Sequence, residues 1–270
     1  MASPRQRNDR RTSRPLSSPS PDHAAGIGHR KRLDDARAEW LWGWHTVLAA
    51  LDNPARPPAK RLIATEDRAR TLKAQDVGVA VEVMDGQAIA QILPPGAVHQ
   101  DVALRTPPLE PVGLDDLADS PGGFLVMLDQ VTDPQNVGAI FRSAAAFGAK
   151  GVIVQDRHAP LLTGTLAKAA AGAIDKIPHA REVNLSRALE HLEQMGWRAV
   201  GLDGEAGESL ETVLSTAPTV LVLGAEGEGL RRLVREHCDA LAHIPMPGGF
   251  ESLNVSAAAA VAMYEVSRKR

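Results

Sequence analysis

The stretch Thr219-Val220-Leu221-Val222-Leu223-Gly224-Ala225-Glu226-Gly227-Glu228-Gly229-Leu230 decides the fold class. Its first five residues predict a buried strand, and the segment from Leu230 onward predicts a helix. The three glycines between them allow a positive φ and a close approach of the backbone to another group. Their spacing is not that of a dinucleotide-binding fingerprint, and the Gly-Lys-Ser/Thr of a phosphate loop is absent. The pattern predicts a loop that either makes a tight structural turn or holds a polar ligand through backbone N–H groups.

The same strand–loop–helix arrangement recurs over the second half of the chain. We predict strands at residues 124–128, 151–155, 198–202, 219–223 and 241–246, and helices at 134–147, 166–173, 185–195, 230–238 and 253–269. Such alternation is typical of a mostly parallel sheet with helices on both faces. Ligand sites in these sheets lie beyond the carboxyl ends of the strands, where three loops of this chain carry unusual residues.

The first loop enters the helix predicted for residues 134–147. Asp133 suits the N-cap and Pro134 the first helical position. Arg142 falls opposite the apolar stripe of this helix, so we expect it to point away from the core. Asn136 and Arg142 are six residues apart and share no face of a continuous helix. They can converge on one site only if Asn136 lies in the entering loop. Taken alone, Arg142 also fits a solvated charge, and Asn136 a cap or turn residue.

The third loop is Ile244-Pro245-Met246-Pro247-Gly248-Gly249-Phe250-Glu251-Ser252-Leu253-Asn254-Val255-Ser256, again between a strand and a helix. Ser252 or Asn254 alone fits a cap of the last helix. Alanines at 257–260 and 262 then give that helix a small-residue surface. This surface can pack closely against another helix, in the same chain or in a second copy.

The first half of the chain predicts a smaller α/β unit behind a basic tail. Residues 39–112 contain a short helix near 47–51 and candidate strands at 61–65, 77–83 and 102–104, and residues 113–122 are interpreted as a linker. Residues 1–38 hold nine Lys/Arg against four Asp, a charge of +5, whereas the other 232 residues sum to −8. The tail is poor in apolar residues and is predicted to be disordered. It fits either an arm that contacts a polyanion or a solubilising segment.

Composition excludes several classes of protein. The 270 residues are 44% hydrophobic, enough for a sizeable core. The single cysteine, Cys238, rules out a disulfide within the chain, argues against a cysteine-built zinc site and fits a reducing, cytoplasmic compartment. No run of 18 apolar residues is present, so we expect no membrane span. The lack of a cysteine cluster leads us to expect no metal in the site.

Together the three loops resemble the three motifs of the SpoU (TrmH) family of RNA 2'-O-ribose methyltransferases, part of the SPOUT superfamily. The motifs are matched by Asp133-Pro134-x-Asn136-x-Gly138-Ala139-Ile140-x-Arg142, by Gly224-x-Glu226-Gly227-x-Gly229-Leu230, and by Ile244-Pro245-Met246 with Ser252-Leu253-Asn254-Val255-Ser256. Gly43-x-His45-x-Val47 and His99-Gln100 resemble the substrate-binding domain that precedes the catalytic domain in many members. The departures are Ser143 where Thr is common, Ala225 where Ser is common, and Asp101 where Gly is usual.

This resemblance implies a knotted α/β catalytic domain at residues 123–270, an RNA-binding domain at 39–112, and a homodimer with its active site near the subunit interface. It implies S-adenosyl-L-methionine as the cofactor, contacted by Gly224, Ile244 and Leu253. The catalytic pocket would be shaped by Asn136, Glu226, Ser252 and Asn254, with Arg142 as the residue that the family treats as catalytic. A guanidinium has a pKa above about 12. We therefore favour a role in which Arg142 clamps an RNA phosphate and positions the 2'-OH, rather than a role as general base.

The expected reaction is 2'-O-methylation of a guanosine ribose in large-subunit ribosomal RNA. One alternative is the same reaction on transfer RNA. The upstream RNA-binding unit favours ribosomal RNA over it. A second alternative is a non-catalytic RNA-binding or ribosome-assembly protein, against which the intact motif residues argue. A nucleotide enzyme of the Rossmann type is disfavoured by the glycine spacing. Selection of the 2'-OH would restrict the enzyme to RNA.

Overall fold

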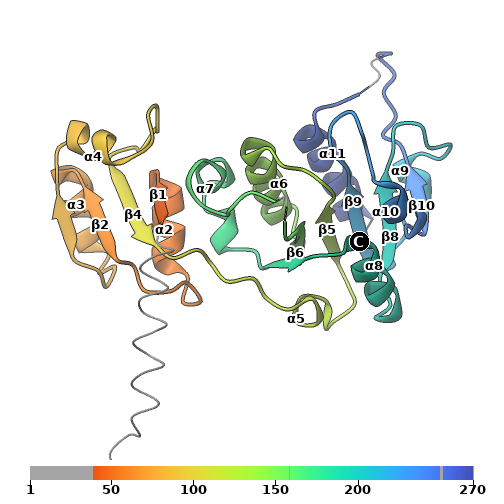
Figure 1. Cartoon of the computed structure of the whole chain (residues 1–270), viewed down its shortest axis with the longest axis horizontal. Helices are drawn as coiled ribbons and strands as arrows, with labels where there is room; N and C mark the ends of the chain where they lie inside the picture. The colour runs from red at the N-terminus through yellow and green to blue at the C-terminus, as the bar shows by residue number, and fades with distance from the viewer. Residues whose placement is uncertain (1–38, 158, 250–251, 270) are drawn as a thin grey trace, which may run out of the picture. The chain divides into compact units, whose positions relative to one another are not determined.

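Two β-sheets organise the residues that the computed structural model describes, which are 39–157, 159–249 and 252–269 (Figure 1). Both sheets belong to one compact body, residues 38–270. The tail predicted to be disordered, residues 1–38, lies outside the described residues. No helix among the described residues has the length and apolar character needed to cross a membrane.

The small sheet is formed by the first half of the chain. Its strand order is β1-β4-β2-β3, with β4 antiparallel to both neighbours and β2 parallel to β3. Its elements are β1 (Glu39–Trp42), α2 (Trp44–Asp52), β2 (Arg61–Ala64), α3 (Glu66–Ala74), β3 (Val81–Val83), α4 (Gly86–Ile92) and β4 (Val102–Thr106). Sequence analysis did not predict α3, which is mostly polar and buries only Ala69 and Leu72. The strand predicted at 77–83 is shorter and begins at Val81.

The large sheet is parallel throughout, in the order β10-β8-β9-β5-β6-β7. Its strands are β5 (Phe124–Leu128), β6 (Gly151–Gln155), β7 (His179–Glu182), β8 (Arg198–Leu202), β9 (Thr219–Leu223) and β10 (Ala240–Ala242). Every residue of β5, β6 and β9 is buried, as expected for strands covered on both faces. The mostly parallel sheet predicted from the alternation is therefore confirmed.

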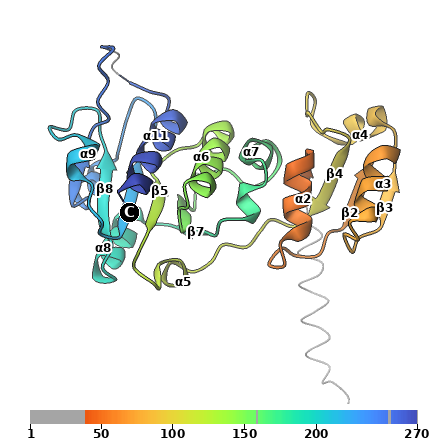
Figure 2. The ribbon, with the colours of Figure 1, turned by 180° about the vertical axis from the view of Figure 1, so that it is seen from behind.

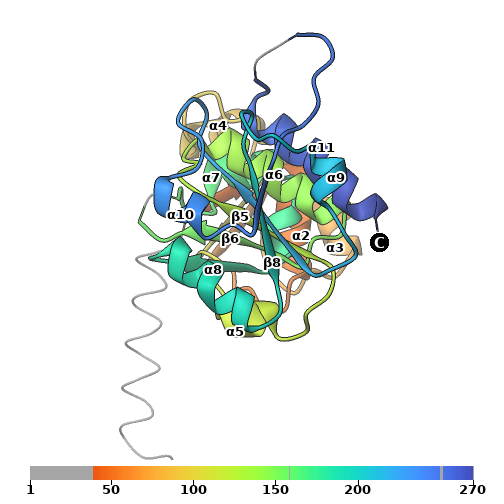
Figure 3. The ribbon, with the colours of Figure 1, turned by 90° about the vertical axis from the view of Figure 1, so that its right-hand side faces the viewer.

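Helices cover both faces of the large sheet (Figures 2 and 3). They are α5 (Leu114–Ala118), α6 (Pro134–Ala146), α7 (Gly164–Ala170), α8 (Leu185–Gln194), α9 (Leu210–Val213), α10 (Arg232–Glu236) and α11 (Val255–Arg268), with a 3-10 turn, η1, at Ala173–Asp175. Side chains of β5 alternate between the two layers: Phe124, Val126 and Leu128 join the cluster under α6 and α11, whereas Leu125 and Met127 join the cluster under α8. The segment interpreted as a linker contains α5, because Leu117 and Ala118 are buried there.

The order of the strands places the site. From β5 the chain passes to β6 and β7 on one side, whereas β9, β8 and β10 lie on the other. The direction of the strand order therefore changes next to β5, and crevices at such points are the usual ligand sites of open parallel sheets. The loops that follow β5, β9 and β10 all leave the sheet at this carboxyl edge.

Candidate active site

The start of α6 places the first site residue. The Asp133 carboxylate caps the helix by accepting a hydrogen bond from the Gln135 N–H at 3.1 Å, and Pro134 occupies the first turn, both as predicted. Asn136 lies inside the helix. It could converge with Arg142 on one site only from the entering loop, so the two residues do not converge within one chain. Six residues of helix separate the two by about 9 Å along the axis and about 120° around it.

Arg142 points away from the core, as the helix geometry predicted. It is exposed, while Ile140 and Phe141 beside it are fully buried. No hydrogen bond or ion pair of its guanidinium occurs within residues 39–157, 159–249 and 252–269. Within one chain Arg142 is therefore separate from the cluster that contains Asn136.

Gly138 of the first motif has a packing function. A Cβ at this position would lie 2.5 Å from the Leu166 carbonyl oxygen and 2.6 Å from the Ala169 Cβ. Only glycine allows α6 and α7 to approach this closely, so any side chain here would push the two helices apart. The first motif thus combines a glycine that fixes the position of α6 with polar groups that α6 presents.

The loop after β9 is held in shape by its glycines and by Asp129. A Cβ on Gly224 would lie 2.2 Å from the Gly229 carbonyl carbon, and Gly227 and Gly229 have φ of 83° and 67°. Asp129, fully buried after β5, accepts hydrogen bonds from the Arg231 N–H at 2.9 Å and the Arg231 Nε at 2.7 Å. The loop is therefore a tight turn, one of the two alternatives that the motif predicted, and it leaves Gly227 and Gly229 exposed.

A carboxylate–amide cluster joins the three motifs. Glu226 Oε1 accepts hydrogen bonds from Asn136 Nδ2 at 3.3 Å, Asn254 Nδ2 at 2.6 Å and the Val255 N–H at 3.1 Å. Asn254 Nδ2 also donates to Asn136 Oδ1 at 3.0 Å, and Asn254 Oδ1 caps α11 by accepting from the Ser256 N–H at 3.0 Å. Asn254 is therefore both the helix cap and a member of the cluster. All three side chains remain accessible to solvent.

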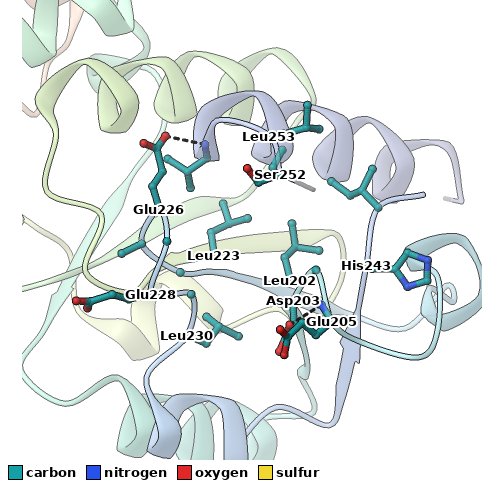
Figure 4. Close-up of a pocket in the computed structure, with 18 of the residues that line it drawn as sticks. Leu202, Asp203, Glu205, Leu223, Glu226, Glu228, Leu230, His243, Ser252 and Leu253 are labelled. Carbon is teal, nitrogen blue, oxygen red and sulfur yellow. Dashed lines mark hydrogen bonds between the residues drawn. The ribbon is translucent and has the colours of Figure 1, made fainter. Parts of the chain in front are cut away.

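A cavity of about 410 Å³ opens beside Glu226 at the carboxyl ends of β8, β9 and β10 (Figure 4). Five of the site residues predicted from the sequence line it: Gly224, Glu226, Ile244, Ser252 and Leu253. Its apolar wall adds Leu202, Leu223, Leu230 and Ala258, and its carboxylates are Asp203, Glu205, Glu226 and Glu228. The single guanidinium among its lining residues, Arg235, pairs with Asp203 at 2.6 Å. The cavity therefore offers an apolar slot with an acidic rim.

Sequence analysis missed the loop between β8 and α9. Figure 4 shows Asp203 and Glu205 close together at the side of the cavity away from Glu226. The strand at 198–202 was predicted, and the rule used for the other loops places the carboxyl end of this strand at the same edge. Applying it to β8 would have identified these two carboxylates.

Cys238 is excluded as a nucleophile. Burial, with Asp239 and Asp129 nearby, raises the pKa of its thiol to about 12. A thiol with such a pKa holds almost no thiolate at neutral pH, and the thiolate is the reactive form. The chemistry of the site therefore rests on carboxylate, amide, hydroxyl and guanidinium groups.

Comparison with known proteins agrees with the three loops. Residues 123–264 match the model of the SpoU rRNA methylase family, and residues 40–112 match that of the RNA 2'-O ribose methyltransferase substrate-binding domain. The chain is 39% identical to a 23S rRNA (guanosine-2'-O-)-methyltransferase of Xylella fastidiosa, over 86% of this chain and 97% of that protein. It is also 39% identical to an uncharacterized tRNA/rRNA methyltransferase of Mycolicibacterium vanbaalenii, over 90% of this chain and 80% of that protein.

A solved structure shows the same fold with a ligand. The SpoU methyltransferase AviRb from Streptomyces viridochromogenes, in complex with AdoMet, superposes with a TM-score of 0.72 at 26% identity, over 90% of this chain and 92% of that one. The resemblance read from the sequence and the α/β fold class it implied are both confirmed. The chain belongs to the SpoU rRNA methylase family.

Proposed function

We propose that this chain transfers a methyl group from S-adenosyl-L-methionine to a ribose 2'-OH of large-subunit ribosomal RNA. The observation that carries the proposal is the cluster of Asn136, Glu226 and Asn254, in which Glu226 also lines the 410 Å³ cavity. Membership of a methyltransferase family makes the chain an enzyme of this class. A non-catalytic RNA-binding protein, the second alternative, would not need a cavity beside the cluster.

The cavity suits the proposed cofactor. Its volume of about 410 Å³ falls within the range of about 300–1,000 Å³ found for small-molecule sites. Ile244 and Leu253 lie on its apolar wall, which suits an adenine, and Gly224 also lines the cavity. The acidic rim suits the cation of a sulfonium. When bound, the cofactor supplies an electrophilic methyl group.

The residues of the chain must orient the acceptor and receive its proton. In the reaction the 2'-oxygen forms a bond to the methyl carbon as the bond between carbon and sulfur breaks, and the 2'-OH loses its proton. Glu226, held by three donors, and the Ser252 hydroxyl are placed to position the acceptor by hydrogen bonding. We assign the proton to water or to a phosphate oxygen, because a guanidinium is not deprotonated at neutral pH.

A homodimer would bring Arg142 to this site. α11 exposes Val261 and Tyr264, 44% and 50% accessible, on the helix whose first turn borders the cavity. Arg142 does not reach the cluster of its own chain by helix geometry. We therefore infer that α11 packs against a second copy and that Arg142 clamps an RNA phosphate at the partner's site.

Mixing two inactive variants tests this arrangement. Arg142→Ala and Glu226→Gln chains, co-refolded, should recover activity that neither variant has alone, because each mixed dimer contains one complete site. Arg142→Lys keeps the charge without the planar fork and should recover only part of the activity. If the mixture stays as inactive as its components while forming dimers, Arg142 acts within its own chain or not at all.

Ribosomal RNA and guanosine are the finer parts of the proposal. The Xylella relative, named for guanosine methylation of 23S rRNA, supports both parts. The match of residues 40–112 to a substrate-binding model supports an RNA substrate. The Mycolicibacterium relative carries a tRNA/rRNA name, so transfer RNA remains the second candidate. Incubation with labelled S-adenosylmethionine and separated rRNA and tRNA distinguishes them. Label confined to tRNA would reject the ribosomal assignment.

The organisation of the chain completes the proposal. We propose an RNA-binding domain at 39–112, a linker at 113–122, and a knotted methyltransferase domain at 123–270. We place the enzyme in the cytoplasm and give the basic tail, residues 1–38, a role in RNA affinity.

A chain starting at Glu39 should keep its turnover at saturating RNA and show a shallower salt dependence of RNA binding. An inactive but folded truncation would contradict this role.

A further inference from the structure

Two residues of the upstream motifs meet a lysine of the large-sheet half. Gln100 Oε1 accepts hydrogen bonds from the Trp44 N–H at 3.0 Å and from Lys168 Nζ, on α7, at 2.7 Å. A Cβ on Gly43 would lie 2.3 Å from Lys168 Nζ, so glycine at this position leaves the space that the lysine occupies. Partial burial in this contact lowers the pKa of Lys168. Gly43 and Gln100 thus have a function that their motifs alone did not reveal.

The backbone at Gln100 is strained to make this contact. Gln100 and Asp101 have φ of 52° and 67°, a left-handed conformation that residues with side chains rarely adopt in succession. Such conformations persist where the surrounding structure holds them, and they concentrate at functional positions. The turn that departs from the family pattern at Asp101 therefore keeps the left-handed geometry that glycine would adopt readily.

A second polar joint lies at the other end of α2. Arg56 donates to Asp175 through Nε at 2.6 Å and through a terminal nitrogen at 3.0 Å, and Asn53 Nδ2 donates to the same carboxylate at 3.1 Å. The Arg56 and Asp175 side chains are 3% and 2% exposed. α2 has nine residues and is about 14 Å long, and the two joints lie beyond its opposite ends. Between them Thr46 Oγ1 donates to the Ala167 carbonyl at 3.2 Å.

The two joints connect the small sheet to the helix that carries site residues. Lys168 and Asp175 both belong to the segment that runs from α7 to η1. α7 packs tightly on α6 at Gly138, and α6 carries Asn136 and Arg142. Residues 39–112 also pack on this segment through apolar side chains, since Leu41 and Val47 share one buried cluster with Leu166. Apolar contacts have little directional preference, whereas the two separated polar joints are directional and add a constraint on orientation relative to α6.

We propose that Lys168 is a positioning residue, whose bond to Gln100 fixes residues 39–112 on α7 so that RNA bound there reaches the α6 site in one register. This rests on the proposed function, since it assigns RNA to both parts. The buried joint at Arg56 acts as a permanent pivot. The half-exposed joint at Lys168 sets the angle about that pivot.

The test compares Lys168→Met with wild type in the full chain, using in vitro transcribed, unmethylated 23S rRNA. We expect kcat to fall on the order of tenfold, with unchanged RNA and S-adenosylmethionine affinities and an unchanged melting temperature. Lys168→Arg, which can still donate to Gln100, should restore most of the rate. Lys176→Met is the matched control, because it removes an equally charged, exposed lysine from the same segment without touching Gln100.

A second measurement needs no activity. Spin labels at Val83→Cys and Val183→Cys, both exposed positions, are introduced in a Cys238→Ala background. The distance distribution between them should be narrow in this background and broad with Lys168→Met added. An unchanged distribution, or an equal loss of rate in Lys176→Met, overturns the proposal. Weaker RNA binding with a shallower salt dependence also overturns it, because Lys168 would then be a phosphate contact.

The two kinds of failure are distinguishable. If wild-type protein transfers no methyl group to the RNA, the proposed function fails while the spin-label distances still report on the joint. If wild type is active and Lys168→Met matches it, the positioning role fails and the proposed function stands.

Discussion

Two carboxylates in this protein each accept three hydrogen bonds and have opposite exposure. Glu226 accepts three hydrogen bonds from residues of α6 and α11, and Asp175 accepts three from residues that follow α2. Glu226 is open to solvent beside a cavity, whereas the side chain of Asp175 is 2% exposed. The comparison shows that the arrangement of bonds alone does not separate a site from a structural joint. Access to solvent and to a cavity does.

The buried joint should show the largest effect, and it should be on stability. Arg56→Met leaves the Asp175 carboxylate buried without its charged partner, which typically costs about 3–5 kcal/mol of unfolding free energy. Urea denaturation followed by circular dichroism measures it. The double variant Arg56→Met with Asp175→Leu removes both charges and should recover much of the loss. If Arg56→Met lowers the unfolding free energy by less than about 1 kcal/mol, the ion pair contributes no more than an exposed one, which would contradict this prediction.

The exposed cluster should show the reverse. Glu226→Gln keeps the shape and removes the charge, so we expect methyl transfer to fall on the order of a hundredfold through loss of positioning. Unfolding free energy should change by less than about 0.5 kcal/mol because the side chain is exposed. Glu193→Gln, on an exposed carboxylate of α8 that does not line the cavity, is the matched control and should stay near wild type. A Glu226 variant that melts much lower yet turns over normally would make the cluster structural.

The smallest effect concerns His179, whose buried ring lies within the influence of the joint. Burial, then the charges of Arg181 and Arg56, lower the pKa of His179 from 6.5 to about 4. The unfolded chain therefore takes up a proton at this residue near pH 6.5 while the folded chain does not, so stability falls as the pH drops below 6.5. Between pH 6.5 and 5 the loss should be about 1.5 kcal/mol.

Comparing His179→Leu with wild type across this pH range isolates the contribution. The leucine variant should lose stability less steeply on acidification, whatever its stability at pH 7. Parallel curves for the two proteins would mean that His179 is protonated in the folded state as readily as in the unfolded one.

The sequence predicted the parts of the fold that have a local pattern. β5, β6 and β9 each contain a continuous apolar run because both faces of the large sheet are covered. β7 was missed, since its sequence His-Ala-Arg-Glu carries only one apolar residue, the small Ala180. The helix predicted at 230–238 is limited to α10, Arg232–Glu236, and the strand predicted at 241–246 to β10, Ala240–Ala242, because the loop glycines and prolines beside them extend the turns.

In the candidate site, too, the features with a local sequence pattern were predicted and the long-range contacts were not. Asp133 as a cap and the outward direction of Arg142 follow from helix geometry, and the structure agrees with both. The pairing of Glu226 with Asn136 and Asn254 has no local signal, because it joins segments 90 and 28 residues apart. The ion pair between Arg56 and Asp175 joins residues 119 apart and left no trace in any motif. Contacts of this kind depend on the packing of whole elements.

One measurement tests the central claim most directly. Unmethylated 23S rRNA is incubated with the protein and S-adenosylmethionine labelled in the methyl group, then digested to nucleosides and separated by mass spectrometry. We predict the label in a single 2'-O-methylated nucleoside, 2'-O-methylguanosine, and its near absence with Glu226→Gln but not with Glu193→Gln. Label on a base rather than a ribose, or equal labelling by both variants, would contradict the account.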